Sequence, residues 1–310
     1  MEQIAILGVA LAVDLILGEY PPRLHPVVWM GRLTDAMVDR SPKSGPRRQL
    51  LYGVLMVLAA LALFAGPAWF LVSYSQRAGG MVYVLAGAVL LKSAFSLRAL
   101  WSAVEQVRLE LTRGDLQEAR RALGRIVSRD VATLTPSLVA AAAIESAAEN
   151  YTDSFVAPLL YFLLLGPAGA IAYRVVNTMD AIVGYRGRYE YLGKAAARLD
   201  DVLNYVPARL AALLLAVSAG PVGGSPLGAL RAMWREHGKT ESPNAGWTMS
   251  AMAGALGVEL VKPGVYQLGA GNREPKDSDV RRSLRVLAAT AALALLLLVL
   301  AEAVLHVRAT

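Results

Sequence analysis

The stretch that decides the fold is LLYGVLMVLAALALFAGPAWFLV, residues Leu50 to Val72. It contains no charged residue, and roughly 20 apolar residues in a helix are enough to cross the hydrocarbon core of a bilayer, about 30 Å thick. A second run of that length, Val286 to Leu305, lies near the end of the 310-residue chain. The chain is 55% hydrophobic and only 18% charged, with a mean hydropathy of +0.44. This composition is too apolar for an ordinary soluble domain, so the sequence predicts an all-α, polytopic integral membrane protein.

Four further apolar runs raise the expected number of membrane segments to about four to six. Two of these runs are short, in the range of about 10 to 14 residues that suits an embedded segment as well as a span. Segments that enter the bilayer and return are tolerated only where protein or a water-filled cavity covers their backbone. The four runs are Ile4 to Leu17, Met81 to Leu97, Phe155 to Tyr173 and Val206 to Ala219.

The positive charge of the loops distinguishes two topologies. Simple alternation of six spans would place the five Lys and Arg residues of Arg174 to Arg198 outside the cell. That conflict disappears if Ser137 to Tyr173 dips into the membrane and returns, and if Val206 to Ala219 is embedded without crossing. Four true spans then leave both termini outside and every charged loop in the cytoplasm. Both topologies remain open, and in either case we expect a cell (inner) membrane protein whose active site faces the cytoplasm.

We expect residues 1–310 to form a single integral membrane domain with two cytoplasmic regions. Residues 98–135 are predicted to form an amphipathic helical hairpin, with helices at Leu100 to Gly114 and at Asp115 to Arg129. In the second helix, Leu116 and Leu123 follow helical spacing while Arg120 falls on another face. A specific binding role is the alternative to a plain hairpin. Residues 220–285 form the second region, which carries the Ser-Pro-Asn-Ala-Gly motif.

Composition also limits the chemistry. The chain has no cysteine and only three histidines, which excludes disulfides, thiolate metal sites and thiol nucleophiles, and disfavours a histidine-rich metal site. Any metal is therefore expected to be a hard cation with oxygen ligands. The net charge of +7 is spread between the apolar runs and not gathered in one patch, so it indicates topology and anionic substrates and not nucleic acid.

The first polar cluster surrounds the N-terminal apolar run. Asp14 lies inside that run, where a carboxylate usually faces a polar cavity or has a partner. The alternative is that Asp14 simply ends a helix near the membrane surface. His25 follows within the next turns, close to Glu19, and is a catalytic candidate as well as a candidate packing or capping residue. Lys92, inside another apolar run, is expected either to extend to the membrane surface or to pair, with Asp14 as a partner.

The second cluster is acidic. On a helix, Glu145 and Glu149 are i and i+4 neighbours, and Asp153 follows one turn later on the same broad face. Next to a membrane segment this pattern indicates carboxylates that hold Mg²⁺ against substrate phosphates. A solvated acidic face is the alternative.

The third cluster combines an amide, acids and a basic segment. Asn177 and Asp180 share a helical face with Gly184. The glycine-punctuated segment that follows can cradle phosphate, although it is not the common phosphate-loop motif. Acids at the next helix can hold a metal or cap the helix. The members of these two groups are Tyr185, Arg186, Arg188 and Lys194, and Asp200 and Asp201.

The fourth cluster, Ser242-Pro243-Asn244-Ala245-Gly246, is predicted to form a turn that opens a helix. Such a turn presents backbone amides to an anion, or it is a plain helix cap.

In this order and spacing, the four clusters resemble the cobalamin biosynthesis family called CobD or CbiB, the adenosylcobinamide-phosphate synthases. The resemblance covers essentially the whole chain, with two departures: Thr248 stands where proline is expected, and a histidine expected before Ser242 is missing. It is carried by Asp14 with Gly18-Glu19-Tyr20-Pro21, His25-Pro26 and Gly31; Glu145-Ser146, Glu149-Asn150 and Asp153-Ser154; Asn177-Thr178-Met179-Asp180 with Gly184-Tyr185; Asp200-Asp201; and Ser242 to Gly246.

The resemblance implies an ATP-dependent amide ligase that joins adenosylcobyric acid to aminopropanol phosphate, or a related amino alcohol, to give adenosylcobinamide phosphate. Because amide formation from a carboxylate is uphill, ATP is expected to form an acyl phosphate that the amine attacks, with Mg²⁺ and basic side chains neutralising the phosphates. The corrinoid is a substrate. A homo-oligomer and association with other membrane-bound cobalamin assembly enzymes are left open.

With that activity, the candidate residues take provisional roles. His25 or Asp14 is the candidate base. The catalytic set is Asp14, His25, Glu145 and Asp180; the substrate- and phosphate-binding set is Lys92, Asn177, Tyr185, Arg186, Arg188, Lys194, Ser242 and Asn244; the metal set is Glu145, Glu149, Asp153, Asp180, Asp200 and Asp201.

Two other functions remain open. A transporter for a corrinoid or phosphate compound would also place charges beside short embedded helices, but it commonly shows two related halves, which this sequence lacks. A non-catalytic membrane sensor of the AmpE type would keep the fold and lose acids that this chain retains.

Overall fold

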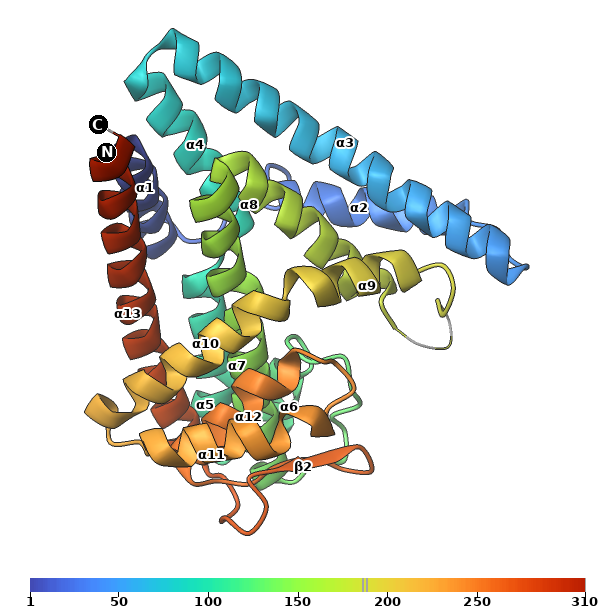
Figure 1. Cartoon of the computed structure of the whole chain (residues 1–310). Helices are drawn as coiled ribbons and strands as arrows, with labels where there is room; N and C mark the ends of the chain where they lie inside the picture. Colours follow the sequence, from blue (N-terminus) through green and yellow to red (C-terminus); the bar gives the residue numbers. More distant parts are fainter. Residues whose placement is uncertain (186, 188, 310) are drawn as a thin grey trace. The chain divides into compact units, whose positions relative to one another are not determined.

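A computed structural model describes residues 1–185, 187 and 189–309, with side chains described as far as Val304. The described chain is almost entirely helical (Figure 1), which confirms the predicted fold class. It divides into two units, each treated by itself. The first unit takes in Met1–Ser96, Ala157–Asn204 and the segment from Val299, and the second takes in Leu97–Val156 and Tyr205–Leu298. The prediction of a single membrane domain stays a prediction.

The helices of the first unit are α1 (Glu2–Ile16), α2 (Pro26–Asp39), α3 (Pro46–Ala78), α4 (Gly80–Ala94), α8 (Ala157–Val183) and α9 (Lys194–Leu203). Those of the second unit are α5 (Leu97–Arg113), α6 (Leu116–Leu123), α7 (Pro136–Tyr151), the π-helical turn η1 (Thr152–Val156), α10 (Tyr205–Ala219), η2 (Gly220–Val222), α11 (Pro226–Glu236), η3 (His237–Lys239) and α12 (Ala245–Leu256). The strands β1 (Leu260–Lys262) and β2 (Tyr266–Leu268) also belong to the second unit, and α13 (Asp277–Ala309) begins in it.

In the described part of the chain, five helical stretches are long and apolar enough to cross a membrane. The chain is therefore a multi-pass helical membrane protein, within the predicted range of four to six segments. The N-terminal helix α1, with 15 residues, is not among the five. The five are Pro46–Ala78, Gly80–Arg113, Pro136–Val183, Tyr205–Val222 and Asp277–Val304.

Helix α3 shows how the charge-free stretch behaves. Pro46 stands in its first turn, where the missing N–H is not needed, and Gly79 ends it with a positive φ of 126°. Large apolar side chains such as Trp69 and Phe70 are exposed along it. A surface of this kind suits lipid and not water.

Helix α8 folds back on itself. Gly166 has a φ of 70° and ψ of −168°, and Pro167 begins the second arm, so the ribbon bends sharply there (Figure 1). The rings of Tyr161 and Tyr173 stack with centroids 5.2 Å apart. In a straight helix, residues 12 positions apart would be separated by about 18 Å. Pro136–Val183 thus contains a helical hairpin inside the segment that the sequence marked as dipping in and returning, while its path in the bilayer stays a prediction.

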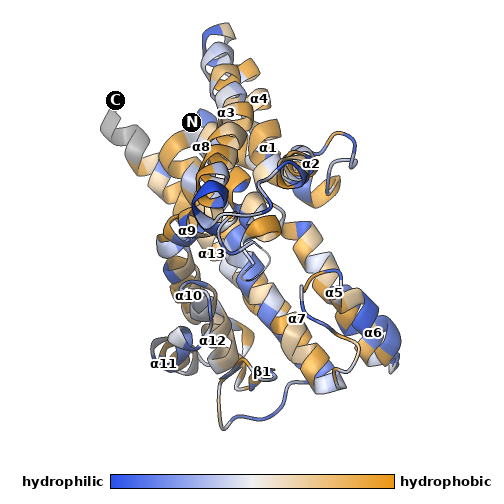
Figure 2. Ribbon diagram, turned by 90° about the vertical axis from the view of Figure 1, so that its right-hand side faces the viewer, coloured by the Kyte–Doolittle hydropathy of each residue, from blue (hydrophilic) through white to orange (hydrophobic). Residues whose placement is uncertain are grey.

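The second unit contains the predicted amphipathic pair, helices α5 and α6, and the ribbon of α6 is largely hydrophilic (Figure 2). Helix α6 begins at an Asp115 cap but ends at Leu123, six residues before the predicted end at Arg129. Gly124, a poor helix former, follows its last residue. Elsewhere in this unit, α11 and α12 cross so closely that a Cβ on Gly254 would overlap the backbone of Gly228.

A short antiparallel hairpin of β1 and β2 follows α12, with Leu260 opposite Leu268. Both leucines are fully buried.

Candidate functional site

The lysine inside the apolar run Met81 to Leu97 forms an ion pair. Lys92, in the last turn of α4, lies with its Nζ 3.1 Å from Asp14 Oδ1 on α1, and both side chains are fully buried. Of the two arrangements expected for Lys92, the structure shows the pair with Asp14 and not a side chain that extends to the membrane surface. Helix α1 approaches α4 at Gly87, where a Cβ would lie 2.6 Å from Ile6 Cδ1. The small residue lets the two helices come close enough for the ion pair to form.

Lys92 is shared with a second carboxylate. Its Nζ is also 3.1 Å from Glu19 Oε1, and the same oxygen accepts a 2.6 Å hydrogen bond from Ser96 Oγ. The other oxygen of Glu19, Oε2, lies 2.9 Å from His25 Nε2. Lys92, Asp14, Glu19, Ser96 and His25 therefore form one continuous network, which we call the Lys92 network.

His25 has a structural task. Its Nδ1 accepts a hydrogen bond from Val27 N (3.2 Å) and caps the N-terminus of α2, as the capping alternative expected. Since Nδ1 accepts, Nε2 carries the proton and donates it to Glu19. His25 is thus a neutral ring in this arrangement, held at both nitrogens.

The network keeps Glu19 ionised. Burial by itself raises the pKa of the Glu19 carboxyl, but the hydrogen bonds from His25 and Ser96 and the charge of Lys92 outweigh it. Together they lower the pKa of Glu19 from 4.5 to about 2. Glu19 is therefore a fixed anion at any physiological pH.

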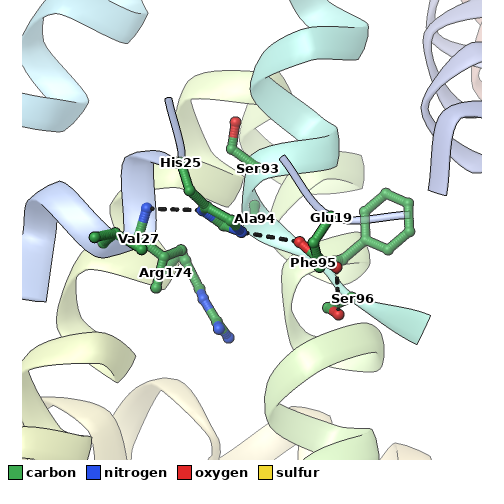
Figure 3. A pocket seen from close by; sticks show the side chains of 9 residues that line it. Glu19, His25, Val27, Ser93, Ala94, Phe95, Ser96 and Arg174 are labelled. Atoms are coloured by element: carbon green, nitrogen blue, oxygen red, sulfur yellow. Dashed lines mark hydrogen bonds and ion pairs between the residues drawn. The ribbon is translucent and has the colours of Figure 1, made fainter. Parts of the chain in front are cut away.

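A pocket of about 150 Å³ opens beside this network (Figure 3). Glu19, whose side chain is 30% exposed, and His25 lie on its wall, and Arg174 from the second arm of α8 lines it as well. In Figure 3, Glu19 and Arg174 lie to either side of the His25 ring. We call this cavity the Glu19 pocket; its other lining residues are Val27, Val28, Ser93, Ala94, Phe95 and Ser96.

Arg174 links the pocket to the amide and acid cluster. Its NH1 donates to Asn177 Oδ1 (3.2 Å), and Asn177 Nδ2 donates to Asp200 Oδ1 on α9 (3.3 Å). Asn204 donates to the other Asp200 oxygen at 2.9 Å and accepts a hydrogen bond from the Tyr173 hydroxyl at the same distance. The structure thus brings together two candidate residues, Asn177 and Asp200, across 23 residues of sequence.

The acids of this cluster differ in their surroundings. Burial and the neighbouring Asp201 raise the pKa of the Asp200 carboxyl, although the two amide donors oppose this. Asp201 itself lies 3.5 Å from the exposed Arg198. Asp180 fills the space where a Cβ of Gly184 would stand, so glycine at 184 makes room for this carboxylate. Asp180 is half-buried on the same arm of α8 as Asn177.

The described residues at the two ends of the predicted phosphate segment are exposed. Tyr185 is exposed, and the exposed Lys194 begins α9. Arg186 and Arg188 lie outside the described residues. Val183 and Gly193 flank the segment at its base, where a Cβ on Gly193 would overlap the Val183 carbonyl.

The second acidic cluster belongs to the other unit. Glu145 on α7 is buried and forms an ion pair with Arg129. Glu149 is half-buried one turn later, and Asp153 is half-buried in η1. Asn150 donates to Ser146, whose hydroxyl donates to the carbonyl of Ile126 at 2.9 Å. Glu145 is therefore tied to a basic side chain and buried, and Glu149 and Asp153 are partly exposed.

The fourth cluster forms the turn that the sequence predicted. Ser242 Oγ accepts hydrogen bonds from the backbone N–H groups of Asn244 and Ala245, both at 3.2 Å. Asn244 is buried and accepts a hydrogen bond from Arg209 NH1 (3.2 Å). The Arg209 guanidinium lies over the rings of Tyr205 and Trp247. Asn244, the N-cap residue of α12, makes no side-chain cap hydrogen bond, so the Ser242 hydroxyl holds the turn in place of a plain helix cap. Arg209 adds a basic side chain.

The acidic side chains of these clusters are the predicted magnesium ligands. Among the described residues, no group of three or more His, Asp or Glu side chains is arranged to hold a metal ion. Mg²⁺ commonly needs only one or two carboxylates together with substrate phosphates, and Asp200 beside Asp201 meets that smaller requirement. The assignment of metal ligands stays a prediction.

Three side chains that line the Glu19 pocket are not among the site residues predicted from the sequence. Glu19 was recognised only as part of a motif, although the GEYP stretch directly after an apolar run was a usable signal. Arg174 stands three residues before Asn177 on one helical face, which could have indicated it. Ser96 gave no signal, because its role depends on the contact between α4 and the Glu19 loop.

Comparison with known proteins agrees with the resemblance seen in the sequence. The family model described as CobD/Cbib protein matches residues 7–296. A protein of Dehalococcoides mccartyi strain CBDB1, named cobalamin biosynthesis protein CobD, is 46% identical over 269 residues, 87% of each chain. A probable cobalamin biosynthesis protein CobD of Methanothermobacter thermautotrophicus is 42% identical over 270 residues, 87% of this chain and 88% of that one. One from Thermococcus kodakarensis is 43% identical over 278 residues, 89% of this chain and 88% of that one.

No solved structure matches this chain. With a family match across nearly its whole length and relatives above 40% identity, the chain belongs to the CobD/CbiB family of cobalamin biosynthesis.

Proposed function

We propose that this protein is an ATP-dependent amide ligase that joins adenosylcobyric acid to aminopropanol phosphate, or a related amino alcohol phosphate, and yields adenosylcobinamide phosphate. Membership of the CobD/CbiB family supports the pathway. The observation that carries the reaction class is the Glu19 pocket, where an ionised carboxylate, a histidine and an arginine line one small cavity. Such a cavity suits a charged substrate that must be oriented and deprotonated.

The amine must lose a proton before its nitrogen can attack the activated carboxyl. Of the two candidate bases, His25 lines the pocket, whereas Asp14 is buried against Lys92. His25 takes the proton on Nδ1, which first releases the Val27 N–H, and the imidazolium that forms is stabilised by Glu19 at Nε2. The pairing of a ring nitrogen with a carboxylate orients the base in the same way as in other acyl-transfer sites.

The phosphates require positive charge. In this proposal, the ATP phosphates lie against Arg186, Arg188 and Lys194, and ATP supplies the free energy that activates the corrinoid carboxyl. Mg²⁺ neutralises the phosphates when it is bound, held by one or two carboxylates. Asp180, Asp200 and Asp201 are the proposed ligands in the first unit, and Glu149 and Asp153 are separate candidates, considered only within the second unit.

The buried ion pair with Arg129 makes Glu145 a weaker metal candidate, because the guanidinium already balances its charge. We retain Glu145 as a residue that acts through Arg129. Ser242 and Asn244 are proposed to contact the substrate at the start of α12, through side chains that the turn holds in position.

The distribution of basic residues among the loops supports a proposed reaction on the cytoplasmic side of the cell membrane. Gly18 to Gln49 and Arg98 to Thr135 carry six and seven Lys and Arg residues, against one in Ser73 to Gly80. The bias favours a cytoplasmic position for the two basic loops.

The direct test uses detergent-purified protein with adenosylcobyric acid, aminopropanol phosphate, ATP and Mg²⁺. Mass spectrometry is expected to find the amide product only when all four components are present, with ATP hydrolysis that depends on both other substrates. Absence of product while corrinoid still binds would contradict the ligase and favour a carrier or sensor.

The metal assignment is tested by Asp180→Asn. Loss of a metal ligand or of transition-state charge stabilisation is expected to lower turnover about 100-fold and to raise the Mg²⁺ concentration needed for half-maximal rate. Asp130→Asn, on an exposed loop, is the matched control. Unchanged turnover and Mg²⁺ dependence in Asp180→Asn would remove Asp180 from the site.

A further inference from the structure

The Glu19 pocket has one anionic and one cationic wall. Glu19 and Arg174 both line it, and Figure 3 shows them on different sides of the His25 ring. Apolar side chains from α2 and from the end of α4, Val27, Val28 and Phe95, line the same cavity. A small molecule with a cation at one end, an anion at the other and a short carbon chain between them matches this distribution.

Glu19 retains acceptor capacity toward the pocket. A carboxylate has about four acceptor positions. Oε1 accepts from Lys92 and Ser96, and Oε2 accepts from His25. One position on Oε2 therefore remains for a further donor, and 30% of the side chain is exposed.

The charge of the network favours a cation at that position. Lys92 is one ammonium group shared by two carboxylates, Asp14 and Glu19, so these three residues carry one net negative charge. His25 adds none while its Nδ1 accepts from Val27. An ammonium group that hydrogen-bonds to Glu19 balances this charge and forms a charge-assisted hydrogen bond.

Arg174 supplies the opposite end. A guanidinium binds phosphate through paired N–H donors, and the NH1 contact with Asn177 holds this side chain in position. The cavity volume of about 150 Å³ is too small to enclose a corrinoid ring but suits a short aliphatic phosphate.

We propose that the Glu19 pocket is the binding site for a zwitterionic amino alcohol phosphate, with its ammonium group on Glu19 and its phosphate on Arg174. This inference rests on the proposed function, because it takes the amine substrate of the ligase as the occupant. It assigns that substrate to one cavity and separates it from the ATP phosphates, which the Arg186 to Lys194 segment is proposed to hold.

The first test compares three ligands on the wild-type protein by isothermal titration calorimetry. These are 1-amino-2-propanol 2-phosphate, isopropyl phosphate, which lacks the amine, and 1-amino-2-propanol, which lacks the phosphate. The zwitterion is expected to bind at least about tenfold more tightly than either half, since each end adds one charge-assisted contact. Equal affinities for the zwitterion and isopropyl phosphate would overturn the proposal.

The second test assigns the two ends. Glu19→Gln keeps the size of the side chain and removes its charge, so it is expected to weaken zwitterion binding about tenfold and to leave isopropyl phosphate binding within about twofold. Arg174→Gln is expected to weaken both phosphates and to leave the phosphate-free amine unchanged. An amine preference that persists in Glu19→Gln, or a phosphate preference that persists in Arg174→Gln, would overturn the assignment.

Matched controls exist on the surface. Glu118→Gln and Arg121→Gln remove the same charges from an exposed i,i+3 pair, and both are expected to bind all three ligands like wild type. If Glu19→Gln fails to fold, the wild-type ligand comparison and Arg174→Gln decide the proposal by themselves.

Failure of this inference and failure of the ligase proposal are distinguishable. If wild-type protein prefers the zwitterion but forms no amide product, the result supports the pocket assignment and contradicts the ligase proposal. Protein that forms the amide product but loses nothing in Glu19→Gln and Arg174→Gln keeps the ligase and contradicts the pocket assignment.

Discussion

Lys92 is the residue on which the N-terminal site depends. Its ammonium group is fully buried and lies within 3.1 Å of both Asp14 and Glu19. Buried charges of this kind gain little net stability when paired, but they destabilise strongly when one partner is removed. An ionisable residue inside an apolar segment therefore indicates function more than stability.

We predict that Lys92→Met lowers the free energy of unfolding by about 3 to 5 kcal/mol, because it leaves two carboxylates without their shared cation. Thermal melts in detergent measure the effect, and Lys43→Met, on the exposed loop before α3, is the control. Adding Asp14→Asn to Lys92→Met is expected to recover part of the loss, since the buried charge is then removed as well. A Lys92→Met melt identical to wild type would show that the ion pair contributes nothing.

The depressed pKa of Glu19 predicts a pH dependence with a definite sign. A carboxyl whose pKa is 4.5 when unfolded and about 2 when folded contributes stability that is fully present above pH 4.5. That contribution is lost as the pH falls from 4.5 toward about 2. The difference in Tm between wild type and Glu19→Gln is therefore expected to shrink over this window. A constant difference across it would contradict the assigned pKa.

At the scale of elements, the fold-back of α8 positions the site. The turn at Gly166 sends the second arm back along the first, and Arg174, Asn177 and Asp180 all lie on that second arm. The stacking of Tyr161 on Tyr173 and the close approach at Gly169 hold the two arms together. The site residues on α8 thus depend on a glycine and a proline that take no part in binding.

Gly169→Ala is predicted to destabilise the protein. A Cβ at this position would overlap the Leu165 side chain and lie 2.9 Å from the Tyr161 carbonyl oxygen. Overpacking of this kind typically lowers stability by about 1 to 3 kcal/mol. Gly66→Ala, inside α3 with nothing within 4 Å of the new Cβ, is the control and is expected to be neutral or slightly stabilising. Equal Tm values for the two variants would argue against close packing of the arms.

At the scale of the whole molecule, the main property is how often the chain crosses the membrane. Five helical stretches of the described chain are suited to span, and one of them contains the α8 hairpin. The distribution of Lys and Arg indicates which loops stay in the cytoplasm. Because the chain has no cysteine, single cysteines can report this directly.

Ser44→Cys and Ser128→Cys are predicted to react with a membrane-impermeant maleimide only after the cells are permeabilised, because both lie in basic loops. Ala78→Cys, at the last residue of α3 beside the turn to α4, is expected to react in intact cells. All three positions are exposed, so packing does not limit the reaction. Labelling of Ser44→Cys in intact cells would reverse the predicted orientation.

Much of the architecture was predictable because hydropathy is a local property. The charge-free run at Leu50 to Val72 became α3, and the apolar run at Val286 to Leu305 lies within α13. The turn at Ser242 and the pairing expected between Lys92 and Asp14 also agree with the structure. The predicted end of α6 at Arg129 is six residues beyond the observed end at Leu123. The apolar residues keep their helical spacing past Gly124, but glycine is a poor helix former and the helix ends before it.

The sequence by itself determined the membrane class, the family and the residue types available for chemistry, since these follow from composition and from motifs along the chain. Tertiary structure alone decided which of these residues meet. It brings Glu19 within hydrogen-bond distance of Ser96 and makes Arg174 a lining residue of the same pocket. It also pairs Glu145 with Arg129. The reason is physical: a motif fixes where a charge lies in the chain, but its partner depends on how closely helices pack, which here is set by small residues such as Gly87 and by the turn at Gly166.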